Sequence, residues 1–128
     1  MTLINPKVIE AIDAVRAHFT GKPVEVVPDG AGGAHVIIKE IEVGPVYTPN
    51  STWLGFQINS AHPHSDVYPH YVGRLTRTDG APLGEAISEC EYQAHPALQL
   101  SRRSNRRDPA IDTPANKAER ILRWLLDR

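Results

Sequence analysis

Cys90 is the single cysteine of the chain, and His95 follows it five residues later, a pair that could carry out nucleophilic chemistry. A thiolate can attack a carbonyl carbon to form a covalent intermediate, and a nearby imidazole can accept or orient the proton. Glu89 and Glu91 flank the cysteine, and two carboxylates should raise the pKa of a thiol unless His95 offsets them. The residues therefore leave two alternatives open, a catalytic Cys90 assisted by His95 and an inert thiol.

Three of the six histidines, His62, His64 and His70, lie within nine residues and could bind zinc through their ring nitrogens. Such a site would support metal-dependent hydrolysis. The spacing matches no zinc signature, however, and a fourth ligand would have to come from a distant part of the chain. We therefore predict no metal and no cofactor. A metal-dependent hydrolase that uses this loop ranks third among the possible functions, behind the two described at the end of this section.

Four arginines occur within six residues near the end of the chain: Arg102, Arg103, Arg106 and Arg107. A guanidinium group is a planar fork that binds phosphate or carboxylate oxygens. The net charge of −1 and the pI of about 6.6 argue against a nucleic-acid binder, which normally has a strongly basic domain. We expect these arginines to bind an acidic protein surface, or to pair with carboxylates of the protein itself.

The composition is that of a globular protein, with 41% hydrophobic and 23% charged residues. A chain of 128 residues can form one domain with a substantial core, so we predict a single domain over residues 1–128. No apolar run approaches the roughly 20 residues that span a bilayer, and the N-terminus lacks the pattern of a signal peptide. A single cysteine excludes an internal disulfide, which favours a cytoplasmic location.

A helix is predicted over residues 5–19. Asn5 can cap its first turn, and Pro6 suits the first helical position. Apolar residues then recur on one face: Val8, Ile9, Ile12, Val15 and Phe19. This face should pack on the remainder of the domain.

Four strands are predicted next, over residues 24–27, 35–43, 53–59 and 70–77. The connections between them are short, which favours an antiparallel meander over crossovers. Residues 81–112 mix short apolar pieces with prolines and arginines, and we expect them to be irregular. Thr113 and Pro114 then begin an amphipathic helix that reaches the C-terminus.

This order of elements, together with several local motifs, resembles the ubiquitin-conjugating (UBC-like) superfamily, in particular its divergent bacterial members. The motifs are the first helix, the strand Trp53-Leu54-Gly55-Phe56-Gln57-Ile58, the Tyr68-Pro69 step before Tyr71-Val72-Gly73-Arg74-Leu75, and His95-Pro96. The resemblance covers residues 5–80 and continues coarsely beyond. It implies an α+β fold with the N-terminal helix on a four-stranded antiparallel meander.

The resemblance also implies a function in a bacterial ubiquitin-like modifier pathway. An active member would be a transferase that accepts the modifier from an activating enzyme as a thioester on Cys90. The chain departs from the family where a His-Pro-Asn tripeptide is expected, because residues 79–82 read Asp-Gly-Ala-Pro. A non-catalytic adaptor that binds the modifier or another partner is therefore the alternative function.

Overall fold

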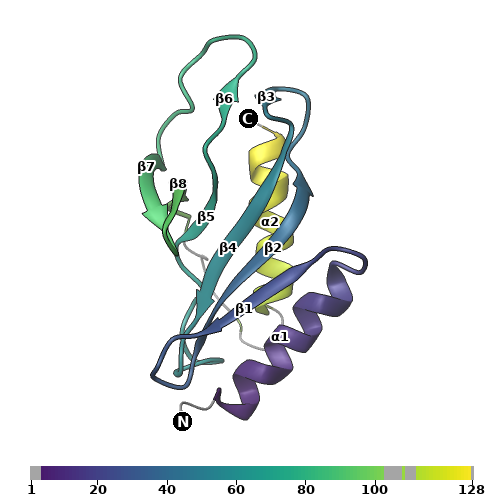
Figure 1. Ribbon diagram of the computed structural model, residues 1–128, viewed down its shortest axis with the longest axis vertical. Helices are drawn as coiled ribbons and strands as arrows, with labels where there is room; N and C mark the ends of the chain where they lie inside the picture. The colour runs from purple at the N-terminus through teal and green to yellow at the C-terminus, as the bar shows by residue number, and fades with distance from the viewer. Residues whose placement is uncertain (1–3, 103–107, 109–111, 128) are drawn as a thin grey trace.

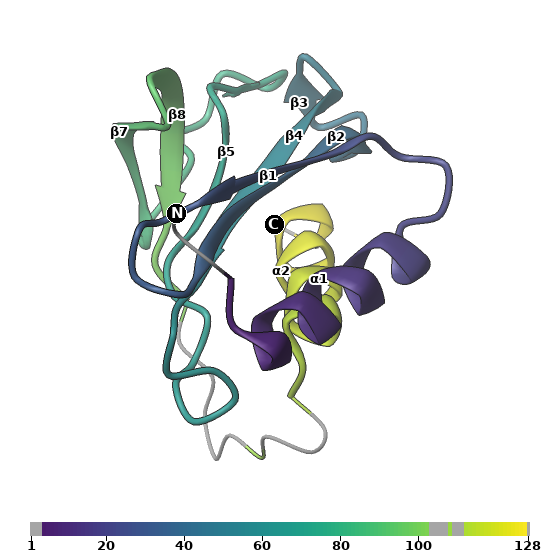
Figure 2. The ribbon, with the colours of Figure 1, turned by 60° about the horizontal axis from the view of Figure 1, so that its bottom comes forward.

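The computed structural model describes residues 4–102, 108 and 112–127. In this part of the chain two helices cover one face of a six-stranded sheet, which makes the fold α+β (Figures 1 and 2). The elements in chain order are α1 (Pro6–His18), β1 (Val24–Pro28), β2 (Ala34–Glu42), β3 (Tyr47–Thr48), β4 (Ser51–Ile58), β5 (His70–Gly73), β6 (Thr76–Arg77), β7 (Ile87–Tyr92), β8 (His95–Leu100) and α2 (Pro114–Leu126). No described helix has the length and apolar character needed to cross a membrane.

The predicted first helix is confirmed as α1, with Asn5 at the N-cap and Pro6 in the first turn. Its buried face consists of Val8, Ala11, Ile12 and Val15, which follow the 3.6-residue period. The C-terminal helix is also confirmed. The Thr113 side chain accepts a hydrogen bond from the Asn116 backbone N–H and so caps α2.

The strand order in the main sheet is β1-β2-β4-β5-β8-β7, and every neighbouring pair is antiparallel. The first four of these strands form the meander that the sequence predicts. Residues 35–43 and 53–59 pair as expected, for example Val36 with Phe56. The turn between β1 and β2 is closed by the Asp29 carboxylate, which accepts hydrogen bonds from the Ala31 and Gly33 backbone N–H groups.

The prediction that residues 81–112 are irregular is wrong for residues 87–100, while residues 103–107 and 109–111 of this segment lie outside the described residues. β7 and β8 form a hairpin in this segment and extend the sheet from four strands to six. Gln93 and Ala94 make its two-residue turn, and both have positive φ, as a type I′ turn requires. The predicted strand over residues 70–77 is also divided, because β5 ends at Gly73 and β6 pairs with β3 in a separate small sheet.

The main core lies between the sheet and the two helices. Apolar side chains of α1 and α2 pack there against the inward-facing residues of the strands. The inward-facing set includes Val36, Ile38, Leu54, Phe56, Ile58, Val72, Leu98 and Leu100. Tyr47 reaches across to α2, where its hydroxyl donates a 2.7 Å hydrogen bond to the Leu125 carbonyl. The opposite face of the sheet, which we call the open face, is covered by neither of the described helices α1 and α2 (Figure 2).

Candidate binding site on the open face of the sheet

An aromatic cluster, formed by Trp53, Tyr71 and Tyr92, lies on the open face. The Tyr71 and Tyr92 rings are stacked, with centroids 4.1 Å apart and planes 13° from parallel. Trp53 lies on the same side, with its centroid 6.2 Å from that of Tyr92. The three residues come from β4, β5 and β7, so they join the hairpin to the central strands. Tyr92 and Ile37 are buried in this second, smaller core.

Glycines of the central strands leave room for this cluster. A Cβ atom at Gly55 would meet the Tyr92 ring at 2.8 Å and the Trp53 ring at 3.0 Å. A Cβ atom at Gly73 would meet the Thr52 hydroxyl and the Trp53 indole. The Tyr92 hydroxyl is hydrogen-bonded to His35 Nδ1 at 2.9 Å, and burial followed by the nearby Tyr71 raises the pKa of Tyr92. The cluster is therefore closely packed, with the Tyr92 ring held between its neighbouring side chains and the backbone of β4.

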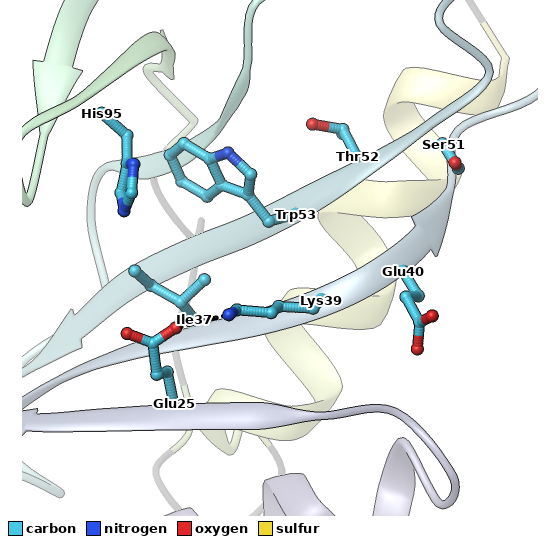
Figure 3. Close-up of a pocket in the computed structure, with 8 residues that line it drawn as sticks. All are labelled: Glu25, Ile37, Lys39, Glu40, Ser51, Thr52, Trp53 and His95. Carbon is cyan, nitrogen blue, oxygen red and sulfur yellow. Dashed lines mark ion pairs between the residues drawn. The ribbon is translucent and has the colours of Figure 1, made fainter.

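A pocket of about 410 Å³ lies beside the aromatic cluster, where β1, β2, β4 and the start of β8 come together (Figure 3). The Trp53 indole and the Ile37 side chain supply its apolar surface. The remaining lining residues are polar: Glu25, Lys39, Glu40, Ser51, Thr52 and His95. An apolar wall with a few polar groups at its rim is typical of sites that bind a ligand or an anchoring side chain.

Two of the charged groups at the pocket are paired with each other. Lys39 Nζ lies 2.8 Å from Glu25 Oε2 (Figure 3), and this hydrogen bond and charge lower the pKa of Glu25. Glu40 lies where β2 is irregular, between Ile38 and Ile41, and has a φ of 58°. The backbone carbonyl of Glu40 accepts a hydrogen bond from Lys22, but its carboxylate has no partner among the described residues.

Cys90 and His95 lie on the same hairpin and face the same side of the sheet. Cys90 pairs with Ala97 and His95 pairs with Tyr92, so the two side chains are diagonal neighbours. No hydrogen bond joins Cys90 to His95 in the described part of the chain. Instead, the His95 ring packs beside Trp53, with centroids 5.9 Å apart, and lines the pocket.

The surroundings of Cys90 do not favour a thiolate. The side chain is partly buried, and this burial raises the pKa of the thiol. Arg74 lowers the same pKa and Glu91 raises it, but the net direction is upward. Arg74 is also engaged elsewhere, because it forms an ion pair with Glu89 and donates a hydrogen bond to the Cys90 carbonyl. The sequence predicts that the flanking carboxylates raise the pKa of the thiol, and Glu91 does so. Glu89 instead forms an ion pair with Arg74.

Of the four arginines considered as binding residues, the structure describes Arg102. Its guanidinium lies over the Trp124 ring of α2, 5.1 Å from the centroid. Arg102 therefore makes a cation–π contact within the protein itself. Arg103, Arg106 and Arg107 lie outside the described residues.

The structure does not bring His62, His64 and His70 together as ligands. Among the described residues there is no group of three or more His, Cys, Asp or Glu side chains that could hold a metal ion. His70 points into the main core, where it is 0% exposed and packs against Phe56. Neither of its ring nitrogens has a hydrogen-bond partner in the described residues, and burial followed by the charge of Lys117 lowers its pKa to about 3.

Sequence reasoning did not identify the aromatic cluster or the pocket. The sequence predicts strands at Trp53 and Tyr71, but Tyr92 lies in the segment for which it predicts irregular structure. The polar–apolar alternation of Glu89, Cys90, Glu91 and Tyr92 indicates a strand, but no recognisable turn residues follow it. Comparison of the chain with protein-family models, curated proteins and solved structures found no match.

Proposed function

We propose that the protein is a non-catalytic binding module of a bacterial ubiquitin-like modifier pathway, built on a UBC-like plan. In this proposal the modifier docks on the open face of the sheet, over the pocket beside Trp53. The resemblance of residues 5–80 to the UBC-like superfamily motivates the choice of pathway. The antiparallel meander with α1 on one face is compatible with that plan.

One observation carries the binding function: a pocket of about 410 Å³ beside a half-buried tryptophan, on a sheet face that neither of the two described helices covers. Tryptophan is enriched among the residues that contribute most to protein–protein affinity, because it buries a large area with little loss of side-chain entropy. The aromatic cluster holds Trp53 in place before any partner arrives, which reduces the entropy cost of binding.

The second candidate function is transfer of the modifier through a thioester on Cys90. Its support is that Cys90 and His95 face the same side of one hairpin and that the charge of Arg74 lowers the pKa of the thiol. In this reaction the Cys90 thiolate would displace the thiolate of the activating enzyme from the modifier's carbonyl carbon, and an amine would then displace Cys90. The upward net direction of the Cys90 pKa places this candidate second.

Two measurements on the same proteins separate these functions. Calorimetric titration with the ubiquitin-like modifier of the same bacterium should give the same affinity for the parent and for Cys90→Ala. Incubation with the activating enzyme, ATP and modifier should leave Cys90 without an adduct. A thiol-cleavable adduct on the parent that Cys90→Ala does not form would instead establish the transferase function. The absence of both binding and adduct would reject the pathway.

A further inference from the structure

We propose that the pocket beside Trp53 receives a basic side chain, lysine or arginine, from the docked partner. This inference rests on the proposed binding function and adds the chemistry of the partner's anchoring residue. It follows from three features of the pocket: an indole ring over which no described lysine or arginine lies, a carboxylate without a partner among the described residues, and an apolar wall.

The two tryptophans of the chain provide an internal comparison. The ring of Trp124 already has the guanidinium of Arg102 over it, 5.1 Å from the centroid. Trp53 has Tyr92 and His95 as ring neighbours, and no lysine or arginine of the described residues lies over its ring. The face of an indole carries negative electrostatic potential, so it attracts ammonium and guanidinium groups. Trp53 therefore offers a cation site that the described part of the protein does not fill.

The charges at the rim also favour a cation. Lys39 and Glu25 neutralise each other across 2.8 Å, and Glu40 then remains as the carboxylate without a described partner. An entering ammonium or guanidinium group could pair with Glu40, whereas an entering carboxylate would meet Glu40 and Glu25 and would have to compete for Lys39. The pocket therefore selects for positive charge.

The apolar part of the pocket fits the remainder of a long basic side chain. Ile37 is buried and lies beside Trp53 on the neighbouring strand β2, so the methylene groups of an entering side chain would contact hydrocarbon at the floor of the pocket (Figure 3). Lysine and arginine bury their aliphatic stems in this way and keep the charged end near water. Ser51 and Thr52 add hydroxyl groups at the same rim.

Four capped tripeptides test the proposal without the partner. Each has glycine at both ends, and the central residue is lysine, arginine, norleucine or glutamate. The readout is the indole N–H resonance of Trp53 in ¹⁵N-labelled full-length protein, with that of Trp124 as the internal control. We expect the lysine and arginine peptides to shift the Trp53 resonance in a saturable manner that weakens with added salt, and the norleucine and glutamate peptides to bind at least about tenfold more weakly. The comparison of lysine with arginine identifies the preferred basic group.

Variants locate the binding. Glu40→Gln should weaken binding of the basic peptides by about threefold, while the matched control Glu85→Gln, on the loop before β7, should leave it unchanged. Trp53→Leu should weaken binding of the basic peptides by about threefold to thirtyfold. In this variant the resonance of the Ile37 backbone amide reports binding, because the indole of residue 53 is absent. The inference would be overturned if the norleucine and lysine peptides bound with equal affinity. It would also be overturned if Glu40→Gln and Trp53→Leu bound the basic peptides with the affinity of the parent.

The two proposals can fail separately. If the modifier binds the parent and the Trp53→Leu variant equally while the basic peptides bind weakly or not at all, the basic anchor is wrong and the binding function stands. If the basic peptides bind at Trp53 but the modifier does not bind, the pocket chemistry stands and the pathway is wrong.

Discussion

Tyr92 lies directly over Gly55, so that a methyl group at position 55 would fall 2.8 Å from the Tyr92 ring. This contact fixes the β7–β8 hairpin to the centre of the sheet, because Tyr92 comes from the edge strand and Gly55 from β4. The open face therefore has a small core of its own, which shapes the wall of the pocket.

Gly55→Ala should destabilise the protein by about 1–3 kcal/mol, because the added methyl group overpacks this contact. Urea unfolding measures the change. The variant Gly55→Ala/Tyr92→Leu should lose less stability than the sum of the two single substitutions, since the shorter side chain leaves space for the methyl group. Strict additivity of the two effects would show that Tyr92 does not restrict position 55.

The stability of the protein should fall on mild acidification because of His70. Burial and the charge of Lys117 lower the His70 pKa from 6.5 to about 3, although Asp66 acts in the opposite direction. Between these two pKa values the unfolded chain binds a proton at His70 that the folded chain does not bind. The contribution of His70 to the free energy of unfolding is therefore fully present above pH 6.5 and decreases as the pH falls below this value. The slope from this residue reaches about 1.4 kcal/mol per pH unit.

His70→Leu removes this titration and also removes two ring nitrogens that lack partners in the described structure. Urea unfolding of parent and variant between pH 5 and 6.5 should therefore show a shallower pH dependence in the variant. The comparison above pH 7 serves as the control, because the parent and variant curves should run parallel there. Equal slopes below pH 6.5 would contradict the buried, neutral state of His70.

The loss of the ion pair between Lys117 and Asp66 should lower the free energy of unfolding more than the loss of an exposed ion pair. Lys117 Nζ lies 2.7 Å from Asp66 Oδ2, and the two side chains are only 6% and 17% exposed. Lys117→Met should cost about 3 kcal/mol, because Asp66 would keep its charge in a partly desolvated position. The control is Lys7→Met, which removes the exposed pair with Glu10 and should change stability by less than about 0.5 kcal/mol. Similar losses in the two variants would contradict this difference.

Cys90 should react slowly with iodoacetamide at pH 7.5. Burial raises the pKa of the thiol, and Arg74 and Glu91 act on it in opposite directions, the first lowering and the second raising it. Glu91→Gln should therefore speed alkylation and Arg74→Gln should slow it, each by about twofold to threefold. Mass spectrometry follows the reaction. A parent rate faster than that of a free cysteine would favour the transferase function.

The sequence was sufficient to predict both helices and the existence of the first four strands of the main sheet, because their apolar periods are regular and their caps and turns use typical residues. It did not predict that the fourth of these strands ends at Gly73 or that residues 76–77 pair with β3. It was not sufficient for the β7–β8 hairpin. Gln93 and Ala94 adopt the positive φ values of a type I′ turn, which glycine or asparagine would normally supply. Pro96 also argues against a strand, but it lies beyond the last β5–β8 pair, where no β5 residue needs its N–H.

The candidate site was less predictable for the same reason. The pocket combines residues of β1, β2 and β4 with His95 from the unpredicted hairpin, so its existence depends on a long-range pairing. The sequence suggests His95 as a partner of Cys90, whereas in the structure His95 packs beside Trp53. The buried state of His70 also follows from α2 closing over the sheet, which the local His-rich pattern does not reveal.

The most direct test of the proposed function is a chemical-shift map of the full-length ¹⁵N-labelled protein during titration with the ubiquitin-like modifier. Binding at the open face should produce the largest changes at Ile37, Trp53 and Tyr71, while the buried face of α1 and the exposed end of α2 change little. Largest changes on the helices, or no change at modifier concentrations in the millimolar range, would contradict binding through the open face.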